Sequence, residues 1–208
     1  MLVGLGTGST ANHFITELGR RIKAEGLEVR AVSSSFASTM LARDQGIPLL
    51  SMDQVSRIDL YVDGADEVDP DKGLLKGRGA AMVGEKLLAQ ACDRFVVIID
   101  ESKRVDRLGK RFPIPVESLP CAWLIVQAGI AALGGAASLR QGAGKDGPLV
   151  TDHGNFVLDA TFARDSDWRA LDASLDALPG VVGHGLFLRF AGKTQVLVGT
   201  PGGVVALP

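Results

Sequence analysis

Apolar runs and amphipathic stretches alternate through the first half of the chain. Four short runs are typical of strands buried on both faces: Leu2–Leu5, Val29–Val32, Ile58–Val62 and Phe95–Ile99. After the first run, apolar residues recur at helical spacing: Ala11, Phe14, Ile15, Leu18 and Ile22. We expect Ser9 or Thr10 to cap this helix and Gly26 to end it, with further helices ending before Gly46 and spanning Ala80–Ala91. This alternation predicts a parallel sheet with helices on both faces.

The pattern changes near Phe112. Its order is extended chain, helix, two strands, helix and strand, over Pro113–Val116, Leu119–Leu133, Ala136–Arg140, Phe156–Thr161, a helix from Trp168 to Leu178, and Val181–Phe190. That order is typical of a split βαβ module. Two final runs, Thr194–Thr200 and Val204–Leu207, are expected to rejoin the first sheet. We therefore predict an α/β domain over residues 1–111 and 191–208, interrupted by a small α+β domain over 112–190.

Composition narrows the class of protein. The formal net charge is −2 and aromatic residues make up 5% of the chain, so neither a basic field nor a base-stacking surface for nucleic acid is expected. We find no run that would span a bilayer and no signal peptide, and expect a cytoplasmic protein. Its two cysteines do not make a disulfide framework. Glycine is the outlier: 26 of the 208 residues are glycine, whereas glycine makes up about 7% of an average protein.

Several of these glycines lie in the segment Gly4–Thr10, between the first strand and its helix. A dinucleotide fingerprint needs a glycine where Ser9 stands, and a phosphate loop of the Walker type needs a lysine that is absent here. What remains is an anion cradle of backbone N–H groups, a helix N-terminus and the hydroxyls of Thr7, Ser9 and Thr10. It suits a single phosphate; the alternative is a tight turn with a capping serine.

Charged residues follow three other predicted strands or turns. Asp63–Glu67 leaves the carboxyl end of a buried strand, where open α/β sheets bind ligands, and its acids suit a polyhydroxylated substrate or Mg²⁺. The alternative is a turn with solvated carboxylates. Lys76–Ala81 is a second glycine-punctuated passage, whose lysine and arginine would balance those acids. Lys103 follows another strand and is expected to point into the same cleft.

The remaining candidates are a glutamate and three histidines. Glu85 lies mid-helix, a position at which most glutamates face solvent. His13, His153 and His184 lack the spacing of a metal site, so we expect them to be structural or exposed and predict no metal centre. No serine lies in a G-x-S-x-G elbow, which leaves hydrolase chemistry without support.

Taken in order, these segments closely resemble ribose-5-phosphate isomerase of type A. The motifs that carry the resemblance span essentially the whole chain: Val3–Thr10, Ala31–Ser35, Tyr61–Glu67, Lys76–Ala81, Glu85-Lys86, Asp100–Lys103, Phe112–Val116, Thr151–Asn155, Pro179–Val182 and Gly199–Pro201. The resemblance implies an open, mostly parallel Rossmann-like sheet with a small ferredoxin-like lobe. It also implies a homodimer or a homotetramer, and the interconversion of D-ribose 5-phosphate and D-ribulose 5-phosphate in the non-oxidative pentose phosphate pathway, without metal or organic cofactor.

The resemblance also implies roles for individual residues. Glu85 would be the base that moves a proton between C2 and C1 through an enediolate, assisted by Asp63, Asp66 and Lys76. The substrate-binding residues would be Thr7, Gly8, Ser9, Thr10, Gly64, Ala65, Gly77, Arg78, Gly79 and Lys103. Because a base next to a carbonyl works best in a closed cleft, we expect Glu85 to be at least partly buried.

The chain departs from the family pattern in three places. Members usually carry a helix before the first strand, Arg78 stands where a glycine is common, and His153 stands where an asparagine is frequent. A non-catalytic sugar-phosphate sensor of related fold is the main alternative, since it would keep the phosphate loop without needing the base. A sugar-phosphate deaminase and a weakly active isomerase are the others.

Overall fold

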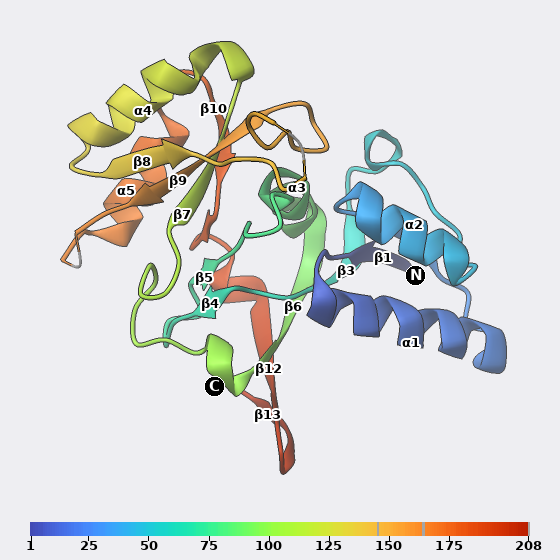
Figure 1. Cartoon of the computed structure of the whole chain (residues 1–208). Helices are drawn as coiled ribbons and strands as arrows, with labels where there is room; N and C mark the ends of the chain where they lie inside the picture. Colours follow the sequence, from blue (N-terminus) through green and yellow to red (C-terminus); the bar gives the residue numbers. More distant parts are fainter. Residues whose placement is uncertain (145, 164, 208) are drawn as a thin grey trace. The chain divides into compact units, whose positions relative to one another are not determined.

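The computed structural model describes residues 1–144, 146–163 and 165–207, which form two compact units (Figure 1). The first unit comprises Met1–Ala65, Gly84–Arg104 and Phe190–Pro208, and the second comprises Asp66–Val83 and Val105–Arg189. Position 208, the end of the predicted α/β domain, lies outside the described residues. The domain limits proposed from the sequence stay a prediction.

The first unit is built on a six-stranded sheet in the order β13-β12-β6-β3-β1-β2. Its strands are β1 (Leu2–Leu5), β2 (Arg30–Ser33), β3 (Ile58–Asp63), β6 (Cys92–Asp100), β12 (Thr194–Thr200) and β13 (Gly203–Ala206). All neighbours run parallel except the edge strand β13, which pairs antiparallel with β12. The final strands therefore rejoin the first sheet, as predicted. The carboxyl ends of β1, β2, β3 and β6 consequently share one edge.

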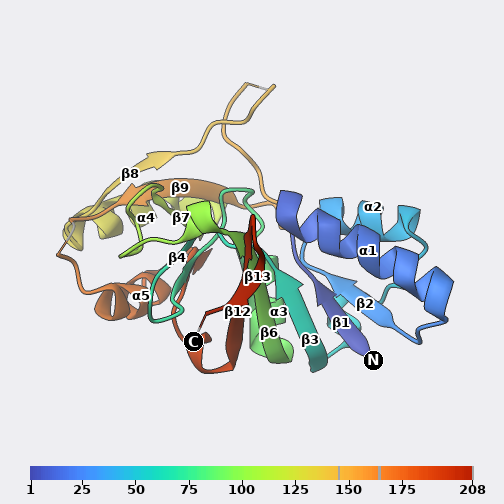
Figure 2. The ribbon, with the colours of Figure 1, turned by 90° about the horizontal axis from the view of Figure 1, so that it is seen from below.

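Helices cover both faces of this sheet (Figure 2). Helices α1 (Ser9–Glu25) and α2 (Phe36–Asp44) lie on one face, and α3 (Met82–Ala91) lies on the opposite one. The apolar stripe of α1 packs with β1 and β2 in one core cluster. Gly26 ends α1 in the left-handed conformation, as predicted. The predicted cap is wrong, because Ser9 and Thr10 already lie in the helix. Gly8 occupies the capping position instead, and it makes no side-chain cap.

The second unit contains the predicted β-α-β-β-α-β order. Its elements are β7 (Ile114–Ser118), α4 (Trp123–Ala132), β8 (Ala136–Leu139), β9 (Phe156–Thr161), α5 (Trp168–Asp176) and β10 (Val181–His184). The strands pair antiparallel in the order β10-β7-β9-β8. Both helices contribute buried residues to one core with β7 and β9. The predicted fold class is confirmed.

A small third sheet was not predicted. It consists of β4 (Glu67–Val68), β5 (Leu74–Leu75) and β11 (Leu186–Phe187), in the order β11-β5-β4. The single strand expected over Val181–Phe190 is therefore wrong. Its chain changes sheets at Gly185, whose N–H donates to Pro115 while its carbonyl accepts from Lys76. Short 3₁₀ turns complete the structure: η1 (Met52–Gln54), η2 (Glu101–Lys103), η3 (Pro120–Ala122) and η4 (Ala191–Lys193).

Within the described ranges, no helix is long and apolar enough to cross a bilayer.

Candidate active site

The carboxyl edge of the six-stranded sheet gathers the predicted residues of the first unit. Thr7 and Gly8 follow β1, Asp63 ends β3, Gly64 and Ala65 follow it, and Lys103 lies in η2 directly after β6. Because these strands are parallel and adjacent, segments far apart in sequence leave the sheet on the same side. The structure thus brings these predicted residues to one edge.

Asp63 is fully buried at this edge and joins the loop after β1 to the end of β3. Its Oδ1 accepts the N–H groups of Thr7 at 3.0 Å and Gly64 at 2.7 Å, and its Oδ2 accepts the hydroxyl of Tyr61. The loop lies so close that a Cβ at Gly6 would overlap this carboxylate. Asp63 therefore positions the predicted phosphate loop.

Thr7 directs its hydroxyl into a cluster that the sequence did not single out as a site. Its Oγ1 lies 2.7 Å from the hydroxyls of both Ser34 and Ser35 and 3.1 Å from that of Ser38. Ser38 in turn donates to the carbonyl of Gly6 at 2.6 Å. The signal was the serine run that follows β2 at the same sheet edge. The cluster adds a second set of hydrogen bonds to the loop that Asp63 holds.

The start of α1 faces outward from this braced loop. Gly8 adopts a φ of 104°, which L side chains rarely adopt, and this turns the chain into the helix. Ser9 is exposed and Thr10 is half-buried in the first turn. Since Gly8 makes no side-chain cap, the first-turn N–H groups and the positive end of the helix dipole suit a phosphate.

Glu85 is buried, with 4% of its surface exposed, which confirms the expectation from the chemistry. It lies in α3 directly after Gly84, where a Cβ would overlap the carbonyl oxygen of Ser34. The helix therefore packs against the serine segment. Glutamate side chains are almost always exposed, so the burial of Glu85 beside a hydroxyl cluster is uncommon.

Tyr61 connects the two acids and was missed by the sequence interpretation. Burial raises its pKa well above 10, and the negative charges of Asp63 and Glu85 raise it further. Its ring stacks on Phe95 with centroids 4.8 Å apart. Positions 61 and 63 point to the same face of a strand, and this period of two was the available signal.

The second unit holds the other predicted residues. Lys76 is buried beside the Phe187 ring, with Nζ 5.8 Å from the ring centroid. Asp66 Oδ2 accepts the N–H of Arg78 at 3.1 Å, so Asp66 lies against the glycine-rich segment that contains Gly77 and Gly79. The Arg78 guanidinium lies 4.1 Å from the Phe112 ring, which gives this departure from the family pattern an apolar platform.

Glu67 has a different role from the acids before it. It is fully buried and accepts backbone N–H groups from Lys110, Arg111 and Phe112. It therefore holds a loop of the second unit. Across the described chain, no three His, Cys, Asp or Glu side chains form a group suited to a metal ion.

Of the histidines, His184 is fully buried, with Nε2 2.9 Å from Asp176 Oδ1.

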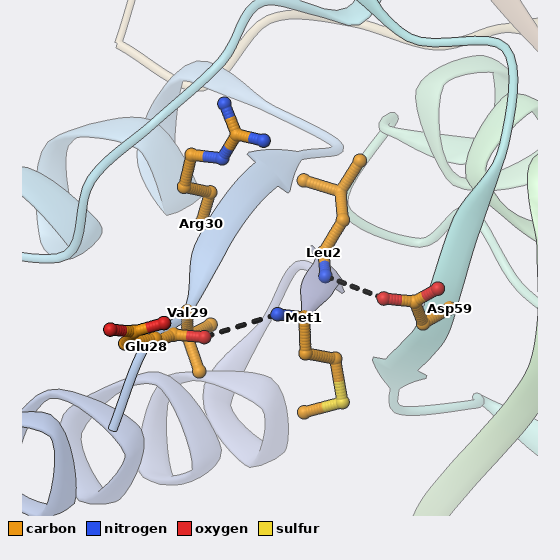
Figure 3. Close-up of a pocket in the computed structure, with 6 residues that line it drawn as sticks. All are labelled: Met1, Leu2, Glu28, Val29, Arg30 and Asp59. Atoms are coloured by element: carbon orange, nitrogen blue, oxygen red, sulfur yellow. Dashed lines mark hydrogen bonds between the residues drawn. The ribbon is translucent and has the colours of Figure 1, made fainter.

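A hollow of about 560 Å³ lies at the amino ends of β1–β3, away from the carboxyl edge of the sheet (Figure 3). Its polar groups are already bonded: Asp59 accepts the N–H of Leu2 at 2.7 Å, and the carbonyl of Glu28 accepts the Met1 ammonium at 3.1 Å. We do not assign the site to it.

Comparisons with known proteins agree on one family. The family model described as ribose 5-phosphate isomerase A (phosphoriboisomerase A) matches residues 30–203. The chain is 47% identical over 205 residues to the ribose-5-phosphate isomerase A of Thermococcus kodakarensis, covering 98% of this chain and 89% of that protein.

Solved structures give the same result. Ribose 5-phosphate isomerase A from Methanocaldococcus jannaschii is 43% identical with a TM-score of 0.93, covering 100% of this chain and 90% of that one. A D-ribose-5-phosphate isomerase in complex with phospho-erythronic acid is 42% identical, with the same TM-score and coverage.

Proposed function

The chain belongs to the ribose 5-phosphate isomerase A family, and we propose that it interconverts D-ribose 5-phosphate and D-ribulose 5-phosphate. The observation that carries this proposal is the burial of Glu85 beside the hydroxyl cluster and the Tyr61–Asp63 pair. An aldose–ketose isomerase needs one sheltered carboxylate that both removes and returns a proton.

Glu85 would take the proton from C2 of the open-chain aldose. The C2–H electron pair then forms the C1–C2 double bond of an enediolate, and the carbonyl oxygen at C1 gains the negative charge. The protonated Glu85 returns the proton to C1, while the C2 oxygen becomes the new carbonyl and its proton passes to the C1 oxygen. This sequence is redox-neutral and balances without a metal or an organic cofactor.

The charge that develops on the enediolate needs a fixed donor. We assign this to Lys76 and to the backbone N–H groups of Gly77–Gly79; removing one such donor typically costs about 3–4 kcal/mol of barrier. Asp66 would accept a sugar hydroxyl, and Lys103 would add positive charge for the substrate. Asp63 would act by positioning, because Thr7, Gly64 and Tyr61 donate to its two oxygens.

The phosphate would bind at the start of α1. Gly8, Ser9 and Thr10 provide the N–H groups and hydroxyls there, and Thr7 orients the loop. Because the phosphate is remote from the reacting carbons, its binding energy serves orientation. Gly64 and Ala65 would line the path of the sugar at the end of β3.

The same proposal extends to assembly and location. We propose a homodimer or homotetramer in the cytoplasm, acting in the pentose phosphate pathway. Large apolar side chains such as Leu124 and Ile125 of α4 are 59% and 65% exposed, which favours association. The molar mass from light scattering tests this part separately.

The test is turnover of ribose 5-phosphate by the purified chain in EDTA, followed as ketose formation. We expect Glu85→Gln to lower kcat by at least about 100-fold with KM nearly unchanged, because the proton shuttle is lost and the phosphate site is kept. Glu25→Gln, an exposed change on α1, is the control and should leave both constants unchanged.

Each alternative has a distinct outcome. A sensor would bind phospho-erythronic acid without forming ketose, and a deaminase would release ammonia from an amino-sugar phosphate. Turnover by Glu85→Gln equal to that of the unchanged chain would refute the assignment of the base.

A further inference from the structure

Arg140 lies directly after β8, and its guanidinium donates hydrogen bonds to two groups of acceptors. One is Asp159 of β9, reached from Nε at 2.9 Å and from Nη2 at 2.5 Å. The other is a pair of consecutive carbonyls, those of Gly77 at 3.1 Å and Arg78 at 3.0 Å, both contacted by Nη1. The side chain of Arg140 is only 15% exposed.

Because peptide bonds are planar, the contacts of Arg140 with these carbonyls also set the direction of the N–H groups in the segment Gly77–Gly79. In a trans peptide the N–H points away from the C=O, so carbonyls drawn to Arg140 turn the N–H groups of Arg78 and Gly79 the other way. The first of these donates to Asp66 Oδ2 at 3.1 Å, which identifies that side as the one where Asp66 lies. Two consecutive N–H groups with one direction form an anion-binding concavity.

Two backbone hydrogen bonds lie at the ends of this segment. The N–H of Lys76 donates to Gly185 at 2.9 Å, and that of Ala80 closes a turn onto Gly77 at 3.0 Å. Arg140 is the side chain that contacts the carbonyls of both peptides between Gly77 and Gly79. Asp159 holds the guanidinium in place through a two-bond fork that a lysine would not reproduce.

We infer that Arg140, held by Asp159, is a positioning residue that aligns the Gly79 N–H group toward the oxygens of the substrate and the Arg78 N–H group toward Asp66. The inference rests on the proposed function, in which this segment stabilises the enediolate. It predicts that loss of the guanidinium lowers kcat more than it raises KM, since a misplacement of about 1 Å can cost about 100-fold in rate.

The test compares Arg140→Ala, Arg140→Lys and Asp159→Asn with Arg189→Ala. Arg189 is the matched control because it also pairs with carboxylates of the second unit, Asp172 and Asp176, but belongs to another network. We expect Arg140→Ala to lose about 100-fold in kcat with KM changed by less than about threefold, and Arg140→Lys to recover little of this. Added guanidinium ion should partly restore Arg140→Ala. Arg189→Ala should stay within about threefold of the unchanged chain.

One further measurement, amide hydrogen exchange, separates the outcomes. Amide hydrogen exchange over residues 76–80 should accelerate in Arg140→Ala and not in Arg189→Ala. The exchange is measured at a temperature below the melting temperatures of all variants, including Arg140→Lys. Equal kcat for Arg140→Ala and Arg189→Ala, or unchanged exchange in the segment, would overturn the inference. If the unchanged chain forms no ketose, the proposed function fails, while the exchange measurement still decides whether Arg140 orients the segment.

Discussion

Tyr61 is the single tyrosine of the chain, and it lies where two acids of the candidate site meet. Its hydroxyl donates to Asp63, so the protonated phenol is part of the bracing that holds the loop after β1. Burial, followed by the charges of Asp63 and Glu85, raises the pKa of Tyr61 well above 10. The folded state therefore favours the protonated phenol strongly.

The raised pKa of Tyr61 predicts the direction in which the stability of the chain changes with pH. A group whose pKa is higher in the folded state contributes stability that is complete below its unfolded value, here about 10, and is lost as the pH rises above it. We expect no phenolate absorbance from the folded chain at pH 10.5 or about that, and its appearance only together with unfolding. Because the chain has one tyrosine, a near-ultraviolet titration reads Tyr61 alone.

Tyr61→Phe is the matched control, since it keeps the ring that stacks on Phe95 and removes only the titrating group. Its free energy of unfolding should fall less steeply above pH 10 than that of the unchanged chain. Phenolate that forms at pH 10 while the circular dichroism stays native would contradict the burial of this hydroxyl.

Individual site residues differ in how far the sequence could predict them. The burial of Glu85 followed from the chemistry of the resemblance, because a mid-helix glutamate by itself is expected in solvent. Arg140 could not be found, since its partners Gly77 and Arg78 lie 63 and 62 residues away and no periodic pattern connects them. Asp63 was found as a site residue, but its hydrogen bonds to Thr7, Gly64 and Tyr61 depend on tertiary structure.

At the scale of elements, continuous apolar strands were predictable and two-residue strands were not. The strands Leu2–Leu5 and Phe156–Thr161 have the predicted bounds, because each is long enough to show a pattern. β4 and β5 are too short to show any period. Their pairing with β11 is set by the hydrogen bonds at Gly185, which a local pattern does not contain.

Helix α3 gives the prediction at this scale, because two effects of opposite sign meet at Gly84. Helix propensity alone would make Gly84→Ala stabilising by about 1 kcal/mol. A Cβ there would overlap the backbone carbonyl of Ser34, which has little freedom to move, and overpacking of this kind costs about 1–3 kcal/mol. We expect net destabilisation, measured as a lower denaturant midpoint, and a lower kcat because the next residue is Glu85.

Gly129→Ala in α4 is the control for propensity. Its Cβ would meet only the end of the Leu178 side chain, at 2.8 Å, and such a side chain can rotate away. This variant should be neutral or slightly stabilising. A stabilised Gly84→Ala with unchanged turnover would show that the helix does not pack tightly on Ser34.

At the scale of the whole molecule, neither unit is one continuous stretch of chain. The chain passes from one unit to the other at Ala65–Asp66, Val83–Gly84, Arg104–Val105 and Arg189–Phe190. The second unit resumes at Val105, before the change of pattern near Phe112, and hydropathy cannot show that Asp66–Val83 belongs with it. Long-range contacts of this kind depend on the tertiary structure.

This discontinuity predicts that residues 112–190, expressed alone, will not fold cooperatively. Their core cluster includes Leu75, Val105 and Leu108, which are at most 8% exposed in the full chain and absent from that fragment. The fragment also lacks β5, the partner of β11, and would expose an unpaired edge. We expect a broad thermal transition, dye binding typical of exposed apolar surface and poor dispersion of its proton resonances, against a sharp transition for the full chain. A fragment with a cooperative transition and native dispersion would show that β7–β10 and their two helices are stable without the segment that carries Lys76.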